Sequence, residues 1–271
     1  MKKLSARRRH PLAAFVVLLF ALAVTGGLYA AFAPADEAKA DTSASAQSLA
    51  IEEGKKLYAT GCASCHGTGG QGTSDGPSLV GVGAAAVDFQ VGTGRMPAQS
   101  PGAQAPKKPR IYTQAQIDQL AAYVASLGPG PSIPTKEQYD PSGADSAAGG
   151  ELFRTNCAQC HNFTGKGGAL TKGKYAPPLD GVSDKHIYEA MVTGPQNMPA
   201  FPDSILPEKE KKEIIAYLQD VNGEDTKSPG GLGLGGFGPV SEGLFAWTII
   251  ISLLIGVAVW VAARTAKARK S

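Results

Sequence analysis

Side chains that can hold a metal or attach a cofactor are scarce in this sequence. Among 271 residues there are four cysteines, four histidines and four methionines, and every cysteine lies in one of two copies of a short motif. Charged residues account for only 18% of the chain, against an average of ~25%, whereas the 34 glycines and 19 prolines exceed their usual shares. This composition predicts loop-rich domains with modest cores, in which a large apolar cofactor can form the centre.

The central part of the sequence also lacks the surplus of basic residues that would indicate binding to nucleic acid. The formal net charge is +3, but nine of the 26 lysines and arginines lie within the first nine and the last eight residues. The remaining 17 basic residues stand against 23 acidic ones, which gives the middle of the chain a charge of −6. We therefore expect no nucleic-acid partner.

Charge is absent altogether from two long stretches beside those basic ends. Residues 11–33 and 244–263 form runs of 23 and 20 residues without a charged side chain, and about 18 or more such residues suffice to cross a bilayer as a helix. Trp247 and Trp260 stand near the ends of the second run, where interfacial aromatic residues occur. The sequence predicts a C-terminal transmembrane helix and an N-terminal helix that is either a retained anchor or a signal peptide cleaved after Ala31-Phe32-Ala33.

The basic residues at both ends predict the orientation in the membrane. Lysines and arginines next to a membrane helix stay on the cytoplasmic side. We expect both termini in the cytoplasm if the first helix is retained, and the acidic middle of the chain on the outer face of the plasma membrane.

The repeated motif has the pattern Cys-x-x-Cys-His. It occurs as Cys62-Ala63-Ser64-Cys65-His66 and again as Cys157-Ala158-Gln159-Cys160-His161. This pattern is the attachment site of a c-type haem, in which two thiols reach the vinyl groups of one porphyrin and the next residue places an imidazole beneath the iron. The sequence thus predicts two covalently bound haem c groups, attached through Cys62, Cys65, Cys157 and Cys160.

Other kinds of cysteine site fit this pattern less well. The two halves of a structural zinc site usually lie within ~15–20 residues of each other, but Cys65 and Cys157 are 92 positions apart. A thioredoxin-like pair lies in a strand-helix context, and no strand pattern precedes Cys62 or Cys157. Simple disulfides would leave the repeated histidine unexplained, so haem attachment is the better interpretation.

The domain around the motif is duplicated. Aligning residues 54–66 with 149–161 gives seven identities in thirteen positions, and the repeat continues from Pro77 and Pro177 to Thr-Gly pairs at 93–94 and 193–194. Each copy shows a helical pattern, the motif, a Gly-rich loop, a short helix, a methionine loop and a closing helix. The predicted fold class is all-α, with two tandem cytochrome c-like haem domains, a C-terminal transmembrane helix and an N-terminal signal-anchor helix.

Shifts in composition predict the boundaries between these parts. Pro, Gly, Ser and Asp are frequent between the two copies and again before the last apolar run. The predicted parts are a basic start with its transmembrane or signal segment (1–33), a flexible tether (34–48), the first domain (49–130), a linker (131–147), the second domain (148–222), a Gly-rich linker (223–243), the transmembrane helix (244–263) and a basic cytoplasmic tail (264–271).

Each copy offers one methionine to complete the coordination of its iron. Met96 and Met198 both follow a Thr-Gly pair and precede a proline, and with His66 and His161 they form the predicted axial ligand pairs. A methionine ligand closes the iron to substrates and raises its potential, which suits electron transfer. Met191 aligns with an ordinary apolar position and is expected in the core, whereas His186 is expected as a solvated residue near a helix start.

With these motifs in place, the chain resembles the di-haem cytochrome c subunit of the cytochrome bc complex of actinobacteria, a menaquinol-oxidising quinol–cytochrome c reductase. The segments that carry the resemblance are CASCH and CAQCH, residues 162–201 (NFTGKGGALTKGKYAPPLDGVSDKHIYEAMVTGPQNMPAF) and residues 241–256 (SEGLFAWTIIISLLIG). The resemblance covers nearly the whole chain. It implies that Cys62, Cys65, His66 and Met96 serve the first haem, and Cys157, Cys160, His161 and Met198 the second.

The resemblance also implies partners that the residues alone do not show. Such a subunit assembles with the cytochrome b subunit, receives electrons from the Rieske iron–sulfur subunit and passes them to the terminal cytochrome c oxidase, without substrate chemistry of its own. Two other functions remain open from the residues: a membrane-anchored electron-transfer subunit of another dehydrogenase or oxidase, and a di-haem peroxidase, which requires an open iron.

Overall fold

The computed structural model describes residues 11–32, 35–222 and 239–268. The chain divides into two units, Met1–Glu52 and Glu53–Ser271. The predicted basic start, most of the Gly-rich linker and the last three residues of the predicted tail lie outside the described residues.

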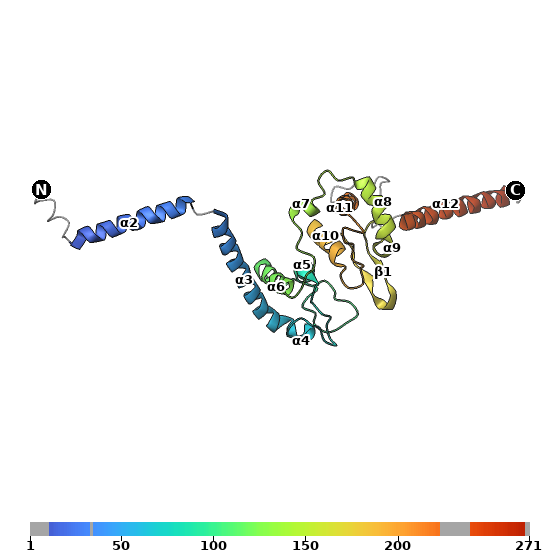
Figure 1. Ribbon diagram of the computed structural model, residues 1–271. Helices are drawn as coiled ribbons and strands as arrows, with labels where there is room; N and C mark the ends of the chain where they lie inside the picture. The colour runs from blue at the N-terminus through green and yellow to red at the C-terminus, as the bar shows by residue number, and fades with distance from the viewer. Residues whose placement is uncertain (1–10, 33–34, 223–238, 269–271) are drawn as a thin grey trace, which may run out of the picture. The chain divides into compact units, whose positions relative to one another are not determined.

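Both uncharged stretches form helices. Helix α2 spans Pro11–Phe32 and helix α12 spans Pro239–Ala268 (Figure 1). They contain apolar spans, Leu12–Tyr29 and Gly243–Arg264, that are long enough to cross a membrane and have none of their residues buried. An unburied apolar surface of this length is typical of helices in contact with lipid rather than with a protein core.

The first module consists of four helices in the predicted order. They are α3 (Ala35–Gly61), α4 (Ala63–His66), α5 (Gly83–Gly92) and α6 (Gln114–Ser126). Thr113 begins α6 with a capping box: its side chain accepts from the backbone of Gln116, whose side chain accepts in return from the Thr113 backbone. The methionine loop lies between α5 and α6, as the repeat predicted.

The second module repeats this order. Its helices are α8 (Ser146–Asn156), α9 (Ala158–His161), α10 (Asp184–Thr193) and α11 (Glu208–Asn222), preceded by the short α7 (Lys136–Tyr139). A small antiparallel hairpin of β1 (Gly168–Ala169) and β2 (Tyr175–Ala176), with the 3-10 turn η1 (Thr171–Gly173) between its strands, is an addition that the sequence did not predict. The prediction of an all-α fold with two cytochrome c-like domains is confirmed.

The first half of α3 differs from the flexible tether predicted for residues 34–48. The helix already begins at Ala35, because this segment is rich in alanine, the residue with the highest helix propensity. The tether was predicted from the absence of an apolar periodicity, but an alanine-rich segment can form a helix without one.

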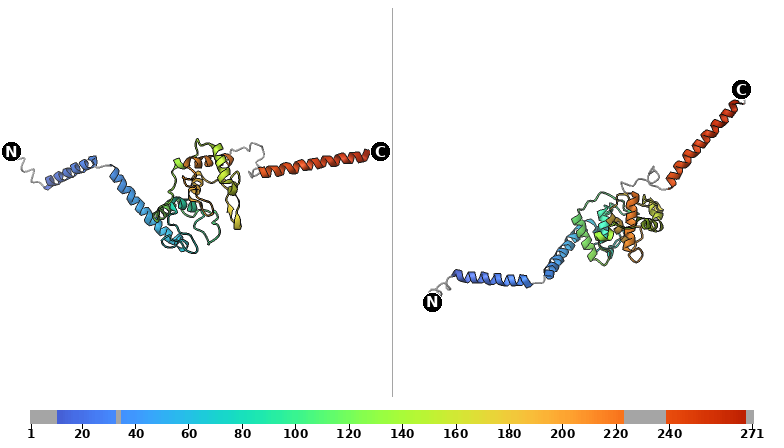
Figure 2. Two further views of the ribbon diagram at one scale, coloured as in Figure 1. Left: turned by 45° about the vertical axis from the view of Figure 1, so that its right-hand side comes forward. Right: turned by 90° about the horizontal axis from the view of Figure 1, so that it is seen from above.

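In each module the first and last helices cross at a glycine. A Cβ atom on Gly54 would lie 1.9 Å from the carbonyl oxygen of Gln119, and one on Gly149 would lie 1.9 Å from that of Glu213. Helices α8 and α11 lie side by side at this crossing (Figures 1 and 2). Aromatic pairs support both crossings, Tyr58 with Tyr123 at 5.0 Å and Phe153 with Tyr217 at 5.4 Å between ring centroids.

Replacing Gly149 with alanine should destabilise the second module strongly. The new methyl group meets backbone rather than a movable side chain, so the helices must separate, at a cost of about 3 kcal/mol or more. We expect the melting temperature to fall on the order of 10 °C. Gly102→Ala is the matched control, because its Cβ would meet nothing closer than 3.8 Å. Equal melting temperatures for the two variants would contradict the close crossing.

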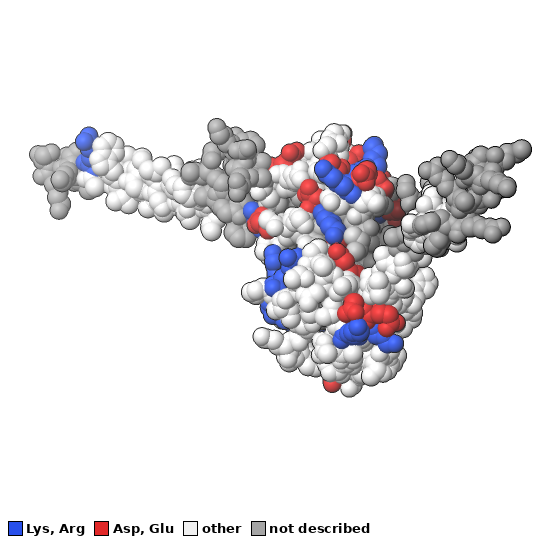
Figure 3. All heavy atoms as spheres, turned by 90° about the vertical axis from the view of Figure 1, so that its left-hand side faces the viewer, with Lys and Arg blue, Asp and Glu red and all other residues white. Residues whose placement is uncertain are grey.

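The surface of the modules agrees with the low charge of the sequence. On the face drawn in Figure 3, lysine and arginine are interspersed with aspartate and glutamate, and much of the surface is uncharged.

Candidate haem sites

Both Cys-x-x-Cys-His motifs form the same local structure. Each first cysteine ends the preceding helix and begins a single helical turn, α4 or α9, that carries the second cysteine and the histidine. The backbone N–H of His66 donates to Cys62 O at 3.0 Å, and that of His161 donates to Cys157 O at 2.9 Å. One turn of helix therefore brings two thiols and an imidazole to one side of the chain.

Each motif histidine is oriented by a proline carbonyl. His66 Nδ1 lies 2.7 Å from Pro77 O, and His161 Nδ1 lies 3.1 Å from Pro177 O. With the Nδ1 proton donated to this carbonyl, Nε2 carries the free lone pair that an iron requires. The sequence had aligned Pro77 with Pro177, but only the structure shows that their carbonyls hold the imidazoles.

No disulfide bond joins any two of the four motif cysteines, so all four thiols are available for haem attachment. Before attachment, burial, with a smaller contribution from the neighbouring cysteine of each motif, raises the pKa of both Cys62 and Cys157 to about 11. Neither cysteine is therefore the low-pKa thiolate that a redox-active pair uses. The pKa of His161 is lowered because the ring is buried, which keeps the imidazole neutral, as a metal ligand must be.

The second module contains a cavity of about 590 Å³ that brings its predicted site residues together. Cys157, Cys160, His161 and Met198 all lie in its wall. The rest of the wall is largely apolar, with Phe153, Leu179, Ile187, Ile214 and Leu218 among its members. Two thiols, an imidazole and a thioether around one apolar cavity fit a covalently attached haem.

Two methionines reach this cavity. Met198 is half-buried in the loop after α10, where its backbone N–H donates to Pro195 O at 3.0 Å. Met191 is only 3% exposed and belongs to the hydrophobic core of the second module, although it also lines the cavity. Its core packing agrees with the prediction from the repeat, and we retain Met198 as the proposed ligand.

In the first module the structure positions the two cysteines and the histidine of the motif on α4 and its N-cap. Met96 is half-buried in the loop after α5, with its backbone N–H donating to Gln90 O at 2.9 Å. Its proposed place opposite His66 rests on its equivalence with Met198 in the repeat.

The long loop of the first module forms part of the second cavity. Gln104 exchanges two hydrogen bonds with the backbone of Tyr175, at 2.7 and 3.0 Å. Gln196 exchanges two with the backbone of Ala105, at 3.1 and 3.2 Å. The cavity wall includes four residues of the first module's loop, Arg95, Gln104, Ala105 and Lys107.

His186 differs from its prediction as a solvated helix residue. Its side chain is 24% exposed and lines the second cavity from α10, with its ring 6.1 Å from that of Phe89 in the first module. The predicted helix start near His186 is correct, because Ser183 caps α10. Which face of α10 packs on the first module is decided by tertiary structure.

Comparison with known proteins agrees with two haem domains. The family model "Cytochrome c" matches residues 51–128, and the model "Cytochrome C oxidase, cbb3-type, subunit III" matches residues 144–218. Each match contains one Cys-x-x-Cys-His motif. The chain therefore carries two covalently bound haem c groups.

Several curated proteins are similar over nearly the full chain. The cytochrome bc1 complex cytochrome c subunit of Mycobacterium tuberculosis is 49% identical over 266 residues, which cover 96% of this chain and 93% of that protein. Those of Corynebacterium efficiens and Corynebacterium diphtheriae are 47% and 44% identical, covering 97% of this chain and 94% and 99% of their own lengths. Together with the two apolar helices, these relatives indicate a membrane protein, and the chain belongs to the family of cytochrome bc1 complex cytochrome c subunits.

Proposed function

We propose that this chain passes electrons from a Rieske iron–sulfur protein to a terminal cytochrome c oxidase, as the di-haem subunit of a quinol-oxidising cytochrome bc complex. Its relatives are named as the cytochrome c subunit of such a complex. The proposed partners are the cytochrome b subunit, the Rieske subunit and the oxidase. The chain itself carries out no substrate chemistry.

The proposal assigns eight residues to the two haems. Cys62 and Cys65 attach the first and Cys157 and Cys160 the second, while His66 with Met96 and His161 with Met198 are the axial ligands. When bound, each haem supplies a one-electron couple. The protein fixes the imidazoles through the Pro77 and Pro177 carbonyls and surrounds the second haem with apolar side chains that exclude water.

The observation that carries this proposal is the complete donor set around the second cavity. His161 and Met198 both line this cavity. If they held the iron together, no coordination position would remain for a substrate. A di-haem peroxidase needs at least one open iron, and no contact of the described residues favours that alternative.

The packing of the two modules supports a direct relay between the haems. Arg95 lies in the wall of the second cavity, and its neighbour in sequence, Met96, is the proposed ligand of the first iron. One short loop therefore contributes both a residue of the second cavity and the proposed ligand of the first iron. Such an arrangement suits a fixed electron path between two complexes without a mobile carrier.

The proposed location of the haem modules is the outer face of the plasma membrane. The basic residues beside each apolar helix support cytoplasmic termini, provided that α2 is retained after processing. The modules between the two helices then lie outside.

Purification of the native chain in detergent tests both the proposed iron ligands and the proposed partners. We expect a c-type absorption band after reduction with dithionite, negligible carbon monoxide binding because both irons are closed, and co-purification of cytochrome b, the Rieske protein and the oxidase. Carbon monoxide binding by about half of the haem would refute closed ligation at one site. Co-purification with a different dehydrogenase or oxidase would favour the alternative assembly.

A further inference from the structure

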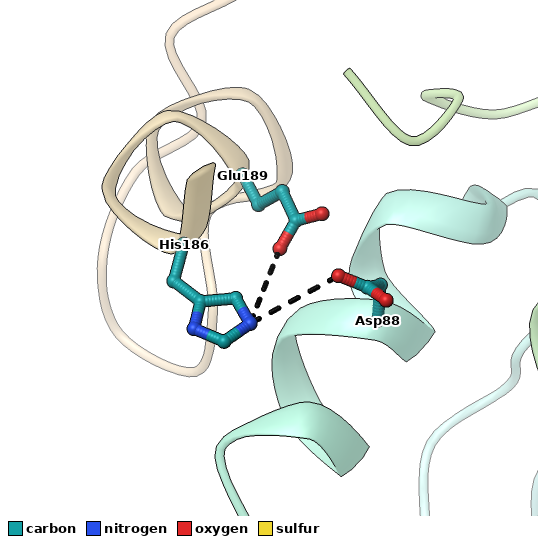
Figure 4. A group of neighbouring side chains, drawn as sticks. All are labelled: Asp88, His186 and Glu189. Carbon is teal, nitrogen blue, oxygen red and sulfur yellow. Dashed lines mark ion pairs between the residues drawn. The ribbon is translucent and has the colours of Figure 1, made fainter. Parts of the chain in front are cut away.

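Two carboxyl groups are buried where α5 of the first module packs on α10 of the second. The residue Asp88 is 1% exposed, and Glu189 is fully buried. One oxygen of each carboxyl and a ring nitrogen of His186 lie within 4.8 Å of one another (Figure 4). Two carboxylates this close in a dry site cannot both remain ionised unless cations or protons compensate them.

Asp88 already has its partners. Lys185 Nζ lies 2.7 Å from Asp88 Oδ2, and Gln114 Nε2 donates to Asp88 Oδ1 at 3.0 Å. The lysine ammonium thus provides the positive charge that a metal ion would otherwise supply between these groups. Asp88 is therefore stable as a carboxylate.

Glu189 has no cation at hydrogen-bonding distance. As a carboxylate it accepts no hydrogen bond on either oxygen, whereas as a neutral acid it can donate one to Asp88. The nearest basic groups are Lys185 Nζ at 3.8 Å and His186 Nε2 at 3.9 Å, both beyond hydrogen-bonding distance. A buried carboxyl in this position is stable when it carries a proton, and costly when it is ionised.

His186 connects this pair to the second haem cavity. Its ring lies in the cavity wall, while its Nε2 faces the two carboxyls (Figure 4). Phe89, next to Asp88, and Ala190, next to Glu189, also line the cavity. The two carboxyls are therefore directly behind the wall, where they experience the charge on a haem iron through a medium of low dielectric constant.

We propose that Asp88, His186 and Glu189 form a proton-binding site coupled to the second haem, which takes up one proton when that haem is reduced and releases it when the haem is oxidised. The inference rests on the proposed binding of the second haem in this cavity. The electron comes from the chain's one-electron donor and leaves to its acceptor. The proton comes from water, forms an O–H bond on a carboxyl oxygen of the pair, and returns to water.

The direction of the coupling follows from charge. A ferric haem carries one positive charge more than a ferrous haem, so it favours the ionised carboxyl. Reduction removes that charge and favours the protonated form. The midpoint potential of the second haem should therefore fall as the pH rises, by up to about 59 mV for each tenfold decrease in proton concentration.

The electrostatic surroundings set the pH range. Burial, reinforced by the neighbouring Asp88, raises the pKa of Glu189 to about 9. Burial opposes ionisation of Asp88 as well, yet the hydrogen bond from Lys185 and those from its other neighbours keep its pKa below the usual value. Burial also lowers the pKa of His186, so the imidazole is neutral. A ferric iron favours the ionised carboxyl and so lowers the pKa of Glu189, which places the coupling below about pH 9.

Charged groups from several helices face Glu189. Asp88 comes from α5, and Lys185 and His186 come from α10. Helix α6 contributes the neutral Gln114, which binds Asp88. Tyr139 of α7 lies near Lys185, and Arg95 and Lys107 of the first module's loop act on His186. On α11, Gln219 binds Asp184 at the start of α10.

The test compares Glu189→Gln with the wild-type chain, both purified with two haems. Glutamine has the shape of the protonated acid but cannot release a proton. We expect the potential of the second haem in the variant to match that of the wild type at about pH 6 and to stay above it beyond roughly pH 8, where only the wild type develops a negative charge. A pH-indicator dye should also show less proton uptake on reduction of the variant.

The control is Glu213→Gln. This carboxyl is also buried and next to a residue of the cavity wall, Ile214, but it is paired with Lys209 at 3.2 Å. Its replacement should leave the slope of potential against pH unchanged. Parallel potential curves for wild type and Glu189→Gln from about pH 5 to 10 would overturn the proposal, while the c-type spectrum of the same samples would show that haem binding stands. If Glu189→Gln does not retain its haem, Lys185→Met replaces it. Loss of the ammonium should move the falling part of the curve to higher pH, and an unmoved curve would equally reject the site.

Discussion

Replacing Met198 with leucine should open the second iron while leaving the first closed. Leucine has nearly the volume of methionine but no sulfur, so the cavity keeps its packing and loses the proposed sixth ligand. About half of the haem should then bind carbon monoxide. The midpoint potential of the second haem should fall by on the order of 0.1 V or more, within the ~0.8 V range that axial ligands command. Carbon monoxide difference spectra and a redox titration measure both effects.

This loss should disable electron transfer through the subunit. A decrease of 0.1 V changes the equilibrium of a one-electron couple roughly fifty-fold, so quinol oxidation by the assembled complex should slow strongly. The variant should still contain two covalent haems, because attachment depends on the thiols and not on the sixth ligand.

Met191→Leu is the matched control for this variant. It removes the thioether sulfur of the other methionine that lines the cavity. That side chain is 3% exposed and packed in the core. A volume-conserving change of this kind should cost less than about 1.5 kcal/mol and leave the spectrum and the potential unaltered. Carbon monoxide binding by Met191→Leu and not by Met198→Leu would reverse the assignment of the ligand.

Removing both thiols of the second motif, by Cys157→Ala with Cys160→Ala, should leave the second module unfolded. The haem is expected to fill the cavity of about 590 Å³. Without the haem, the apolar side chains of this wall face water, and their lost burial is large against the stability of a domain, about 5–15 kcal/mol. Without its haem the module has too small a core to remain folded.

Intact mass and circular dichroism measure this effect. We expect the mass of one haem instead of two, together with a loss of helical signal that corresponds to the second module. The reciprocal variant, Cys62→Ala with Cys65→Ala, should lose the other haem. A double variant that keeps both haem masses would show that these thiols are not the points of attachment.

The local parts of the haem sites could be predicted from the sequence because the spacing of a few neighbouring residues defines them. Two thiols and an imidazole within five residues form one helical turn at His66 and again at His161, whatever the rest of the chain does. The repeat allowed Met96 and Met198 to be predicted as the remaining ligands, because equivalent positions in duplicated domains have similar environments. The two apolar helices could be predicted equally well, since crossing a bilayer requires only length and the absence of charge.

Contacts between the modules could not be predicted in this way. The irregular loop that contains Gln104 has no periodicity, and nothing near it in sequence indicates that it pairs with Tyr175 and lines the second cavity. Asp88 lies in the largely apolar α5 and Glu189 in the amphipathic α10, and acidic residues usually face water. Burial of the two side chains follows only from the packing of α5 on α10.

The sequence by itself determined the cofactor, the duplicated all-α domains and the two apolar helices, and it predicts the attachment points, because each of these depends on short-range spacing or composition. Tertiary structure decided that Pro77 and Pro177 orient the imidazoles, that the first module completes the cavity of the second, and that His186 joins that cavity to a buried pair of carboxyls. These features depend on atoms from segments up to about a hundred residues apart, and only the packing of helices across a shared core brings such atoms together.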